Sequence, residues 1–249
     1  MIEYLKQSIL QFNWHIFTKW QDLLFIICYN LVMRKDRIKI LYEDKSIVVV
    51  SKPSHLLTIS TDNEKEKTMF HKVIEYERKK NKNNKVFIVH RLDKDTSGIL
   101  VFAKNERIKR QLQDNWQNTK RYYQAVVEGN VEKKEDTIKS YLKENKALIT
   151  YSTNKSDGKL AITKYKVIKT NKKYSLLDIE ILTGRKNQIR VHMNDINHPI
   201  IGDKKYNSKT NPIKRLGLHA NKLILQHPIT KQTMTFEDKT PKEMLSLFE

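Results

Sequence analysis

The stretch VFIVHRLDKDTSGILVFAK, residues 86–104, decides how the centre of this chain folds. Two apolar runs, Val86 to Val89 and Ile99 to Ala103, enclose a segment that holds a His, an Arg, two Asp, a Thr, a Ser and a Gly. Apolar residues on both sides of polar turn residues are typical of two strands joined by a short loop. Reacting groups often lie on a loop held between rigid strands, and here the carboxylate of Asp93 follows the guanidinium of Arg91 by two residues.

Further motifs precede and follow this loop along the chain. They are residues 47–57 (IVVVSKPSHLL), 120–129 (KRYYQAVVEG), 182–193 (LTGRKNQIRVHM), 198–203 (HPIIGD), 216–220 (LGLHA) and 227–228 (HP). Together with residues 90–104 they resemble the motifs of the RluA-type RNA pseudouridine synthases, in the order of that family. The resemblance runs from about Ile38 to the C-terminus, and several motifs in the right order count for more than any single one.

The charge of the chain points to a polyanion as partner. Among 249 residues, 48 are Lys or Arg and 28 are Asp or Glu, which gives a formal net charge of +20. An excess of this size is typical of proteins that bind nucleic acid. A codon bias toward Lys would explain part of the excess, but it does not explain the shortage of acidic residues.

Residues 1–35 precede the matching region, and we treat them as an N-terminal extension to a catalytic domain at residues 36–249. The apolar run at residues 23–32 is shorter than the ~20 residues that cross a bilayer as a helix, and no cleavage site of small residues follows it. The extension is either an added amphipathic helix or an upstream translation artefact. Cys28 is the single cysteine, so no disulfide can form within the chain, and we expect a protein of the cytoplasm that binds no membrane.

Apolar periodicity predicts an α+β fold with a mixed, mainly antiparallel sheet and flanking helices. The expected strands are residues 38–41, 46–51, 122–128, 160–168, 174–181 and 218–225, and the expected helices follow Thr68 and span residues 106–116 and 185–194, with a short helix at the C-terminus. Residues 131–138 are charged, and we expect a loop there. The resemblance implies the pseudouridine synthase catalytic domain, without the separate N-terminal RNA-binding module that many members carry.

Asp93 is the candidate catalytic residue. In the family that the motifs resemble, the first Asp of the loop is catalytic, and that position is Asp93 here. A carboxylate suits the reaction, because breaking the bond between uracil and ribose leaves positive charge on the sugar. An Asp in a loop more often caps a turn, and we give that structural role to Asp95 instead.

The resemblance assigns roles to three further residues. Tyr123 matches the active-site Tyr, whose ring can stack on uracil and whose phenol can take part in proton transfer, although a Tyr in a strand often only packs in the core. Arg190 matches an Arg that pairs with the catalytic Asp, and such a pair would lower the pKa of Asp93. Arg91 matches an Arg that stabilises the gap left by an extruded base, while an ion pair with Asp95 is the simpler alternative.

Three more basic residues are candidates for RNA binding. Arg185 and Lys186 lie near the expected start of a helix, where they could bind phosphate. Lys52 belongs to the first motif, which lies on the substrate side in the family. Asn187 stands where the family usually has His, so we assign it no titrating role.

We expect no metal and no cofactor. His90, His192 and His219 are scattered in the sequence, no cysteine or second carboxylate completes a ligand set with them, and the family needs neither metal nor cofactor.

The resemblance therefore implies an RNA pseudouridine synthase that isomerises specific uridines in rRNA or tRNA, acting as a monomer on structured RNA. A non-catalytic RNA-binding protein on the same scaffold is the alternative, but such a relative would be expected to lose Asp93. A metal-dependent nuclease would explain the charge, yet it needs a carboxylate cluster that we do not see.

Overall fold

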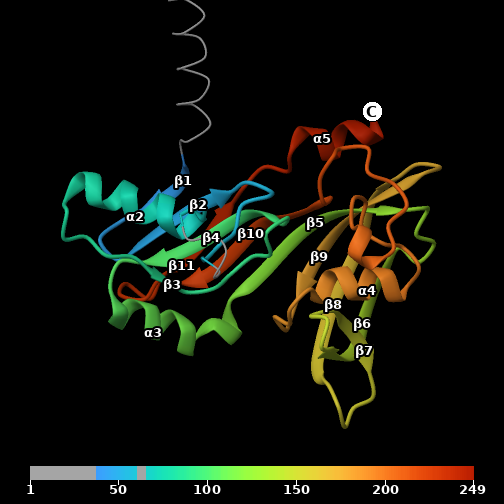
Figure 1. Ribbon diagram of the computed structural model, residues 1–249, viewed down its shortest axis with the longest axis horizontal. Coiled ribbons are helices and arrows are strands. Elements are labelled where there is room, and N and C mark those ends of the chain that lie inside the picture. The colour runs from blue at the N-terminus through green and yellow to red at the C-terminus, as the bar shows by residue number, and fades with distance from the viewer. Residues whose placement is uncertain (1–37, 61–65) are drawn as a thin grey trace, which may run out of the picture. The chain divides into compact units, whose positions relative to one another are not determined.

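The computed structural model describes residues 38–60 and 66–249. From Lys39 onward these residues form a sheet of eleven strands, whose main path runs β1-β2-β4-β10-β5-β9-β8-β6-β7, while β3 pairs with β4 and β11 pairs with β10 (Figure 1). Only β4 and β10 pair in parallel. The mixed, mainly antiparallel α+β fold predicted from the sequence is confirmed.

The strands are β1 (Lys39–Glu43), β2 (Ile47–Lys52), β3 (Phe87–Ile88), β4 (Ser97–Ala103), β5 (Lys120–Glu128), β6 (Glu135–Glu144), β7 (Thr150–Thr153), β8 (Lys159–Thr170), β9 (Tyr174–Ile181), β10 (Leu218–Gln226) and β11 (Thr233–Glu237). The α-helices are α2 (Met69–Lys80), α3 (Glu106–Asp114), α4 (Gln188–Asp195) and α5 (Lys242–Leu245). Short 3-10 turns are η1 (Trp116–Asn118), η2 (Lys204–Tyr206) and η3 (Ser246–Phe248).

One half of the sheet, around β4, is covered on both faces. All seven residues of β4 are buried. Val101 packs in one cluster with Ile108 and Leu112 of α3, whereas the ring of Phe102 lies 6.5 Å from the ring of Phe70 in α2. Because successive side chains of a strand point to opposite faces, α2 and α3 cover opposite faces, as the continuous apolar sequence of β4 requires.

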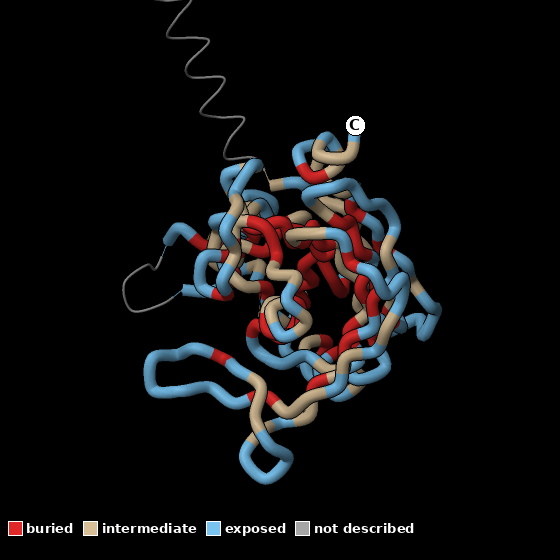
Figure 2. The backbone as a smooth tube through the Cα atoms, turned by 90° about the vertical axis from the view of Figure 1, so that its right-hand side faces the viewer, coloured by how far each residue is buried: buried red, intermediate tan, exposed pale blue. Residues whose placement is uncertain are grey.

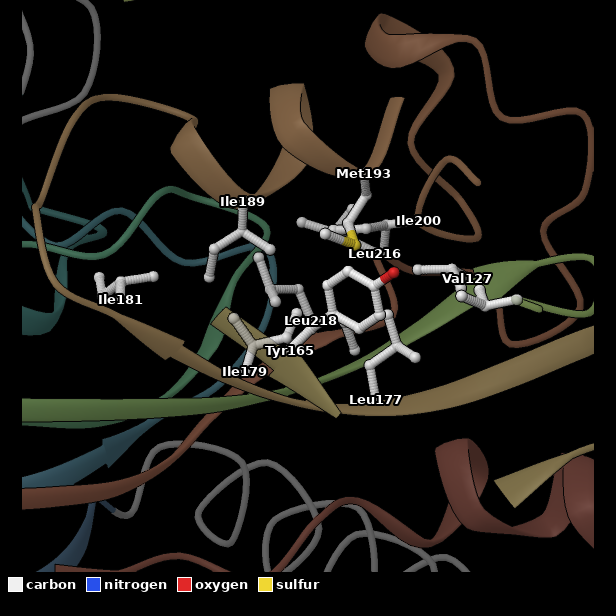
Figure 3. Packing of buried hydrophobic residues seen from close by; sticks show 12 residues of the cluster. Val127, Tyr165, Leu177, Ile179, Ile181, Ile189, Met193, Ile200, Leu216 and Leu218 are labelled. Carbon is white, nitrogen blue, oxygen red and sulfur yellow. The ribbon is translucent and has the colours of Figure 1, made fainter. Parts of the chain in front are cut away.

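The other half of the sheet, from β5 to β7, is covered by α4 on one face. Ile189 and Met193 extend from α4 toward Tyr165, Leu177 and Ile179 of the strands (Figure 3). Buried and exposed residues alternate along most of β8, so its other face carries polar side chains. This alternation is the pattern of a sheet with one face in the core.

β10 joins the two halves, because it pairs in parallel with β4 and antiparallel with β5. Gly98 pairs with Ala220, has a φ of 116°, and leaves no room for a side chain, because a Cβ would lie 2.2 Å from the carbonyl oxygen of Ala220. Ser97 Oγ and His219 Nδ1 form a hydrogen bond of 2.8 Å across the same junction. Buried segments lie toward the middle of the fold and exposed segments toward its outside (Figure 2). The loop that precedes β4, residues 90–96, is called the site loop below.

Most elements expected from the sequence are present within two residues of their expected ends. The first helix begins as expected, with Thr68 Oγ1 accepting a hydrogen bond of 3.1 Å from the backbone N–H of His71. Two expectations are wrong. Residues 131–138 are not all loop, because β6 begins at Glu135, and α4 begins at Gln188 rather than at Arg185. Asn187 has a left-handed φ of 55°, so the chain turns there and becomes helical only afterwards.

The N-terminal extension expected at residues 1–35, with its apolar run and Cys28, lies outside the described residues. In the part of the chain that the structure describes, no helix is long and apolar enough to cross a membrane.

Candidate active site

A cleft of about 300 Å³ opens beside the site loop, between β5 and the segment that leads into α4. It brings together most of the residues that we singled out from the sequence, although they are far apart along the chain. They are Arg91, Asp93, Tyr123, Arg185 and Arg190. The volume is at the lower end of the ~300–1,000 Å³ of ligand pockets, so it suits one residue of a polymer.

The backbone of the site loop is held by side chains from the segment after β2. The Thr58 hydroxyl accepts a hydrogen bond of 3.1 Å from the N–H of Leu92 and donates one of 2.8 Å to its carbonyl. Ser54 Oγ donates a hydrogen bond of 2.6 Å to the carbonyl of Asp95. Asp93 therefore lies on a loop that is fastened on both sides of it, which holds the carboxylate in place before any ligand binds.

Lys52 fastens the same loop, so the prediction that it binds RNA is wrong. Its side chain is fully buried, and Nζ donates hydrogen bonds to the carbonyls of Pro53 (2.9 Å), Leu56 (2.7 Å) and Lys94 (3.0 Å). Burial lowers the pKa of Lys52 to about 7, against the attraction of the nearby aspartates. An ammonium that is closed off from solvent cannot contact a phosphate, but it can tie the residue after Asp93 to the first motif.

Arg190, at the start of α4, is held chiefly by Asp203. Its Nε and Nη2 donate hydrogen bonds of 2.6 and 2.7 Å to the two carboxylate oxygens of Asp203, and Nη1 donates one of 2.9 Å to Asn187 Oδ1. Nη1 also lies 3.9 Å from Asp93 Oδ2. The pairing of Arg190 with Asp93 is thus present but long, because a buried carboxylate already neutralises the guanidinium.

The charge environment of Asp93 differs from what the sequence led us to expect. Burial raises the pKa of the Asp93 carboxyl above its ordinary value, and this effect exceeds the opposing attraction of Arg190, Arg91, Lys52 and Lys186. Arg190 does lower this pKa, as predicted, but burial outweighs its contribution and the net shift is upward. The Asp93 side chain is 28% exposed, so a ligand in the cleft can still reach it.

Tyr123 both lines the cleft and packs against the core. Its ring lies against the cluster that includes Ile179 and Leu218, and the same residue forms part of the cleft wall. Burial raises the pKa of Tyr123 to about 12. The phenol is therefore protonated at neutral pH, so it can donate a hydrogen bond and present a ring for stacking.

The three exposed basic candidates surround the cleft differently. Arg91 is exposed on the site loop. Arg185 donates a hydrogen bond of 2.9 Å from Nε to the carbonyl of Leu160, and Lys186 pairs with Glu144 at 2.6 Å. The alternative of an ion pair between Arg91 and Asp95 is not observed, since Asp95 Oδ1 lies 2.9 Å from the ring nitrogen of His55.

Four further residues of the site were given no role in it from the sequence. Asn187 and Asp203 hold Arg190, and Trp116 and Arg121 line the cleft. Asp203 ends a quoted motif and Arg121 lies two residues before Tyr123, so motif position was a signal for both. Asn187 carried another, because Asn tolerates the left-handed backbone that starts this turn.

The three histidines considered as metal ligands have structural partners. His90 Nε2 accepts a hydrogen bond of 3.1 Å from the N–H of Val101, and His192 Nδ1 lies 2.8 Å from Thr163 Oγ1. Burial lowers the pKa of His90 to about 3 and that of His192 to about 4. Among residues 38–60 and 66–249, no three His, Cys, Asp or Glu side chains gather as a metal site would require.

The cleft combines a carboxylate, a stacking ring and four guanidinium groups. A carboxylate held in place can attack an electron-poor carbon or remove a proton from its neighbour. A Tyr ring can stack on a base, and a guanidinium can bind phosphate through its planar fork. This set of groups fits a nucleotide within a nucleic-acid strand.

Comparison with known proteins agrees with this chemistry. The family model for RNA pseudouridylate synthase matches residues 46–195. A protein of Mycoplasma genitalium, named as an uncharacterized RNA pseudouridine synthase, is 38% identical, and the match covers 84% of this chain and 67% of that protein. The ribosomal large subunit pseudouridine synthase D of Buchnera aphidicola is 34% identical over 84% of this chain and 71% of its own length.

The fold has the same relatives. The structure named human RNA pseudouridylate synthase domain containing 4 superposes with a TM-score of 0.70 at 22% identity, over 83% of this chain and 90% of that one. The family match covers more than half of the chain, and it includes the site loop, β5 and α4. By its sequence and its fold, this chain belongs to the RluA-type RNA pseudouridine synthases, which are isomerases that act on RNA.

Proposed function

We propose that this protein isomerises specific uridines in rRNA or tRNA, with Asp93 as the catalytic carboxylate. The observation that carries the proposal is the position of Asp93 on a fastened loop, in a cleft that it shares with Tyr123 and Arg190. A uridine in structured RNA enters such a cleft only after it leaves its stack.

In the proposed reaction, the bond between ribose C1′ and uracil N1 breaks, the base rotates, and C5 bonds to C1′. Breakage leaves positive charge on the sugar and negative charge on the base. Asp93 either captures C1′ or removes the proton at C2′. The proton on C5 is lost at the end and N1 of the product carries a proton, so the isomerisation balances without a cofactor. The raised pKa of Asp93 makes its carboxylate a stronger base and nucleophile than an exposed aspartate.

The other residues have supporting roles in this proposal. Tyr123 stacks on the uracil and, with its pKa near 12, keeps its phenol proton. Arg190 attracts the ionised form of Asp93 across 3.9 Å. Arg91, exposed on the site loop, occupies the space left by the extruded base, and a planar guanidinium suits this task because it can stack and bind phosphate together.

Arg185 and Lys186 are proposed to bind the RNA backbone beside the cleft. Both are exposed, and Lys186 pairs with Glu144, whose side chain is 31% exposed. A surface ion pair of this kind contributes little to stability, so Lys186 can exchange its partner for a phosphate at small cost.

We propose the class of RNA from the names of two relatives. Buchnera aphidicola and Nitrosomonas europaea each have a relative named ribosomal large subunit pseudouridine synthase D, which favours rRNA. Mapping of pseudouridine at nucleotide resolution, in total RNA from a strain that lacks this protein, tests the proposal. We expect the loss of one or a few sites in rRNA or tRNA and their return on complementation. If the strain that lacks this protein loses no pseudouridine, and no other enzyme modifies the same sites, the proposal is contradicted.

A further inference from the structure

Arg121 is a cationic residue of the cleft that the proposed reaction does not use. It lies on β5 two residues before Tyr123, so the two side chains are on the same face of the strand. It lines the same cleft as Asp93, together with Trp116. Two residues of an antiparallel strand span ~7 Å, so Arg121 lies about that far along β5 from Tyr123.

The guanidinium of Arg121 is poorly satisfied. In the part of the chain that the structure describes, its one hydrogen bond runs from Nη2 to the carbonyl of Leu182 at 3.4 Å, and Nε is buried with no acceptor. Among the described residues, no carboxylate pairs with it. Arg190 in the same cleft differs clearly, since Asp203 takes two of its donors at 2.6 and 2.7 Å.

An unpaired charge in a half-buried position costs free energy, because the protein replaces only part of the lost water. Burial accordingly lowers the pKa of Arg121, and Tyr123 is the group that opposes this shift. The guanidinium packs closely on Gly184, where a Cβ would lie 2.7 Å from Nη1, and both residues line the cleft. These features describe donors that lack an acceptor at the wall of the cleft.

We propose that Arg121 binds a backbone phosphate that flanks the target uridine. The proposal rests on the proposed function, because the base is expected to lie against Tyr123. A phosphate lies several ångströms from the base of its own nucleotide, and the spacing along β5 suits that separation. The planar fork of a guanidinium matches the oxygens of a phosphate, which would satisfy the donors that the protein leaves unpaired.

The test uses a synthetic RNA stem-loop with the mapped uridine, and versions with an uncharged methylphosphonate on its 5′ or its 3′ side. Dissociation constants and single-turnover rates at saturating enzyme are measured for the wild type, Arg121→Gln and Arg121→Lys. Lys120→Gln is the matched control, because this exposed neighbour lies on the opposite face of β5. Melting temperatures of all variants show whether each one is folded.

For Arg121→Gln we expect binding that is about tenfold weaker, a salt slope reduced by about one, and a saturated rate within about threefold of the wild type. Arg121→Lys should bind RNA less tightly than the wild type and more tightly than Arg121→Gln, because it keeps the charge and loses the planar fork of the guanidinium. One of the two methylphosphonates should weaken binding by the wild type and add no further loss to Arg121→Gln. Lys120→Gln should bind as the wild type does.

If the loss of RNA affinity in Arg121→Gln adds fully to the loss caused by each of the two methylphosphonates, Arg121 contacts neither phosphate and the proposal is overturned. A saturated rate that collapses while binding is unchanged would overturn it too, since Arg121 would then act on the charge of the base. If the wild-type protein binds the RNA but forms no pseudouridine, the proposed function fails, and the binding measurements still decide the phosphate contact.

Discussion

At the scale of single residues, burial and neighbouring charges act in opposite directions on the pKa of Asp93. Burial favours its neutral form, while four cationic side chains favour the carboxylate, and burial prevails. A pKa that is higher in the folded than in the unfolded state means that ionised Asp93 costs stability at neutral pH; this cost decreases as the pH falls through the folded pKa and is gone below the unfolded pKa. The fold therefore accepts a less stable group at the position where the reaction needs one.

The pH dependence of activity should report this raised pKa. Because the carboxylate is the active form, kcat/KM should fall on the acid side with a midpoint above the ~3.9 of an ordinary aspartate. The pKa of Tyr123 is about 12, so the phenol should cause no fall up to about pH 9. Rates measured from about pH 3 to about pH 9, with RNA affinity followed in parallel, test both limbs. An acid midpoint at or below that of a free aspartate would contradict the burial of Asp93.

Lys52→Met should damage the fold rather than RNA binding. The substitution leaves three carbonyl oxygens without their donor, so we expect a loss of about 1–3 kcal/mol in the free energy of unfolding and a lower turnover, because the carbonyl of Lys94 is released. Thermal melting and the salt dependence of binding separate the two roles. Lys45→Met is the control, since Lys45 is exposed in the bend that precedes the same strand. Unchanged stability together with a salt slope reduced by about one would restore the role in RNA binding.

At the scale of elements, the turn before α4 positions the guanidinium beside Asp93. Asn187 has a φ of 55° and is buried, and its side-chain oxygen accepts a hydrogen bond from Arg190. Gln188 holds the same turn, because its Oε1 accepts hydrogen bonds from Thr183 Oγ1 and from the N–H of Arg185. Asn187 thus both makes the turn and helps Asp203 to orient Arg190.

Two substitutions of Asn187 separate backbone from side chain. Asn187→Gly keeps the left-handed turn at little cost, so stability should remain near that of the wild type while turnover falls several-fold through loss of the amide. Asn187→Ala should lose the same activity and in addition about 1–2 kcal/mol of stability, because Ala disfavours this conformation. Single-turnover rates and denaturant titrations measure the two effects. Full activity in Asn187→Gly would mean that Asp203 alone orients Arg190.

Elements with local signals could be predicted from the sequence. The site loop, β5 and most of α4 were predicted because motif residues and apolar periodicity lie within a few positions of one another. β6 was missed over its whole length, and residues 135–138 were expected to be loop, since the strand carries many charged and polar residues and one of its faces is exposed. Contacts distant in sequence were missed as well. The bond from Lys52 to the carbonyl of Lys94 spans 42 positions, and no pattern near Lys52 marks it as buried.

At the scale of the whole molecule, the sheet places motifs from separate parts of the chain around one cleft. β10 pairs in parallel with β4 and antiparallel with β5, so it joins the two halves of the sheet, and the site loop enters β4 beside it. The motifs indicated that these segments act together. Their arrangement depends on strand pairings between distant residues, which the order of the motifs does not contain.

The net charge of +20 also acts at this scale. If the basic residues around the cleft contact RNA, binding should weaken linearly in log affinity against log salt, with a slope of about −3 to −5 for ~4–6 phosphates neutralised. Titration of a fluorescent stem-loop RNA at several salt concentrations measures the slope. A nearly flat dependence would mean that the charge is spread over the surface and forms no RNA-binding face.

The measurement that tests the central claim most directly compares pseudouridine formation by the wild-type protein and by Asp93→Asn on an RNA that carries the target uridine. The amide keeps the shape of the side chain and loses its charge. We expect pseudouridine from the wild type and less than about 1% of its rate from Asp93→Asn, with RNA binding within a few fold. The variant should melt no lower than the wild type, because burial disfavours the ionised carboxylate. A folded, RNA-binding Asp93→Asn protein that forms pseudouridine at more than a few per cent of the wild-type rate would contradict the assignment of Asp93.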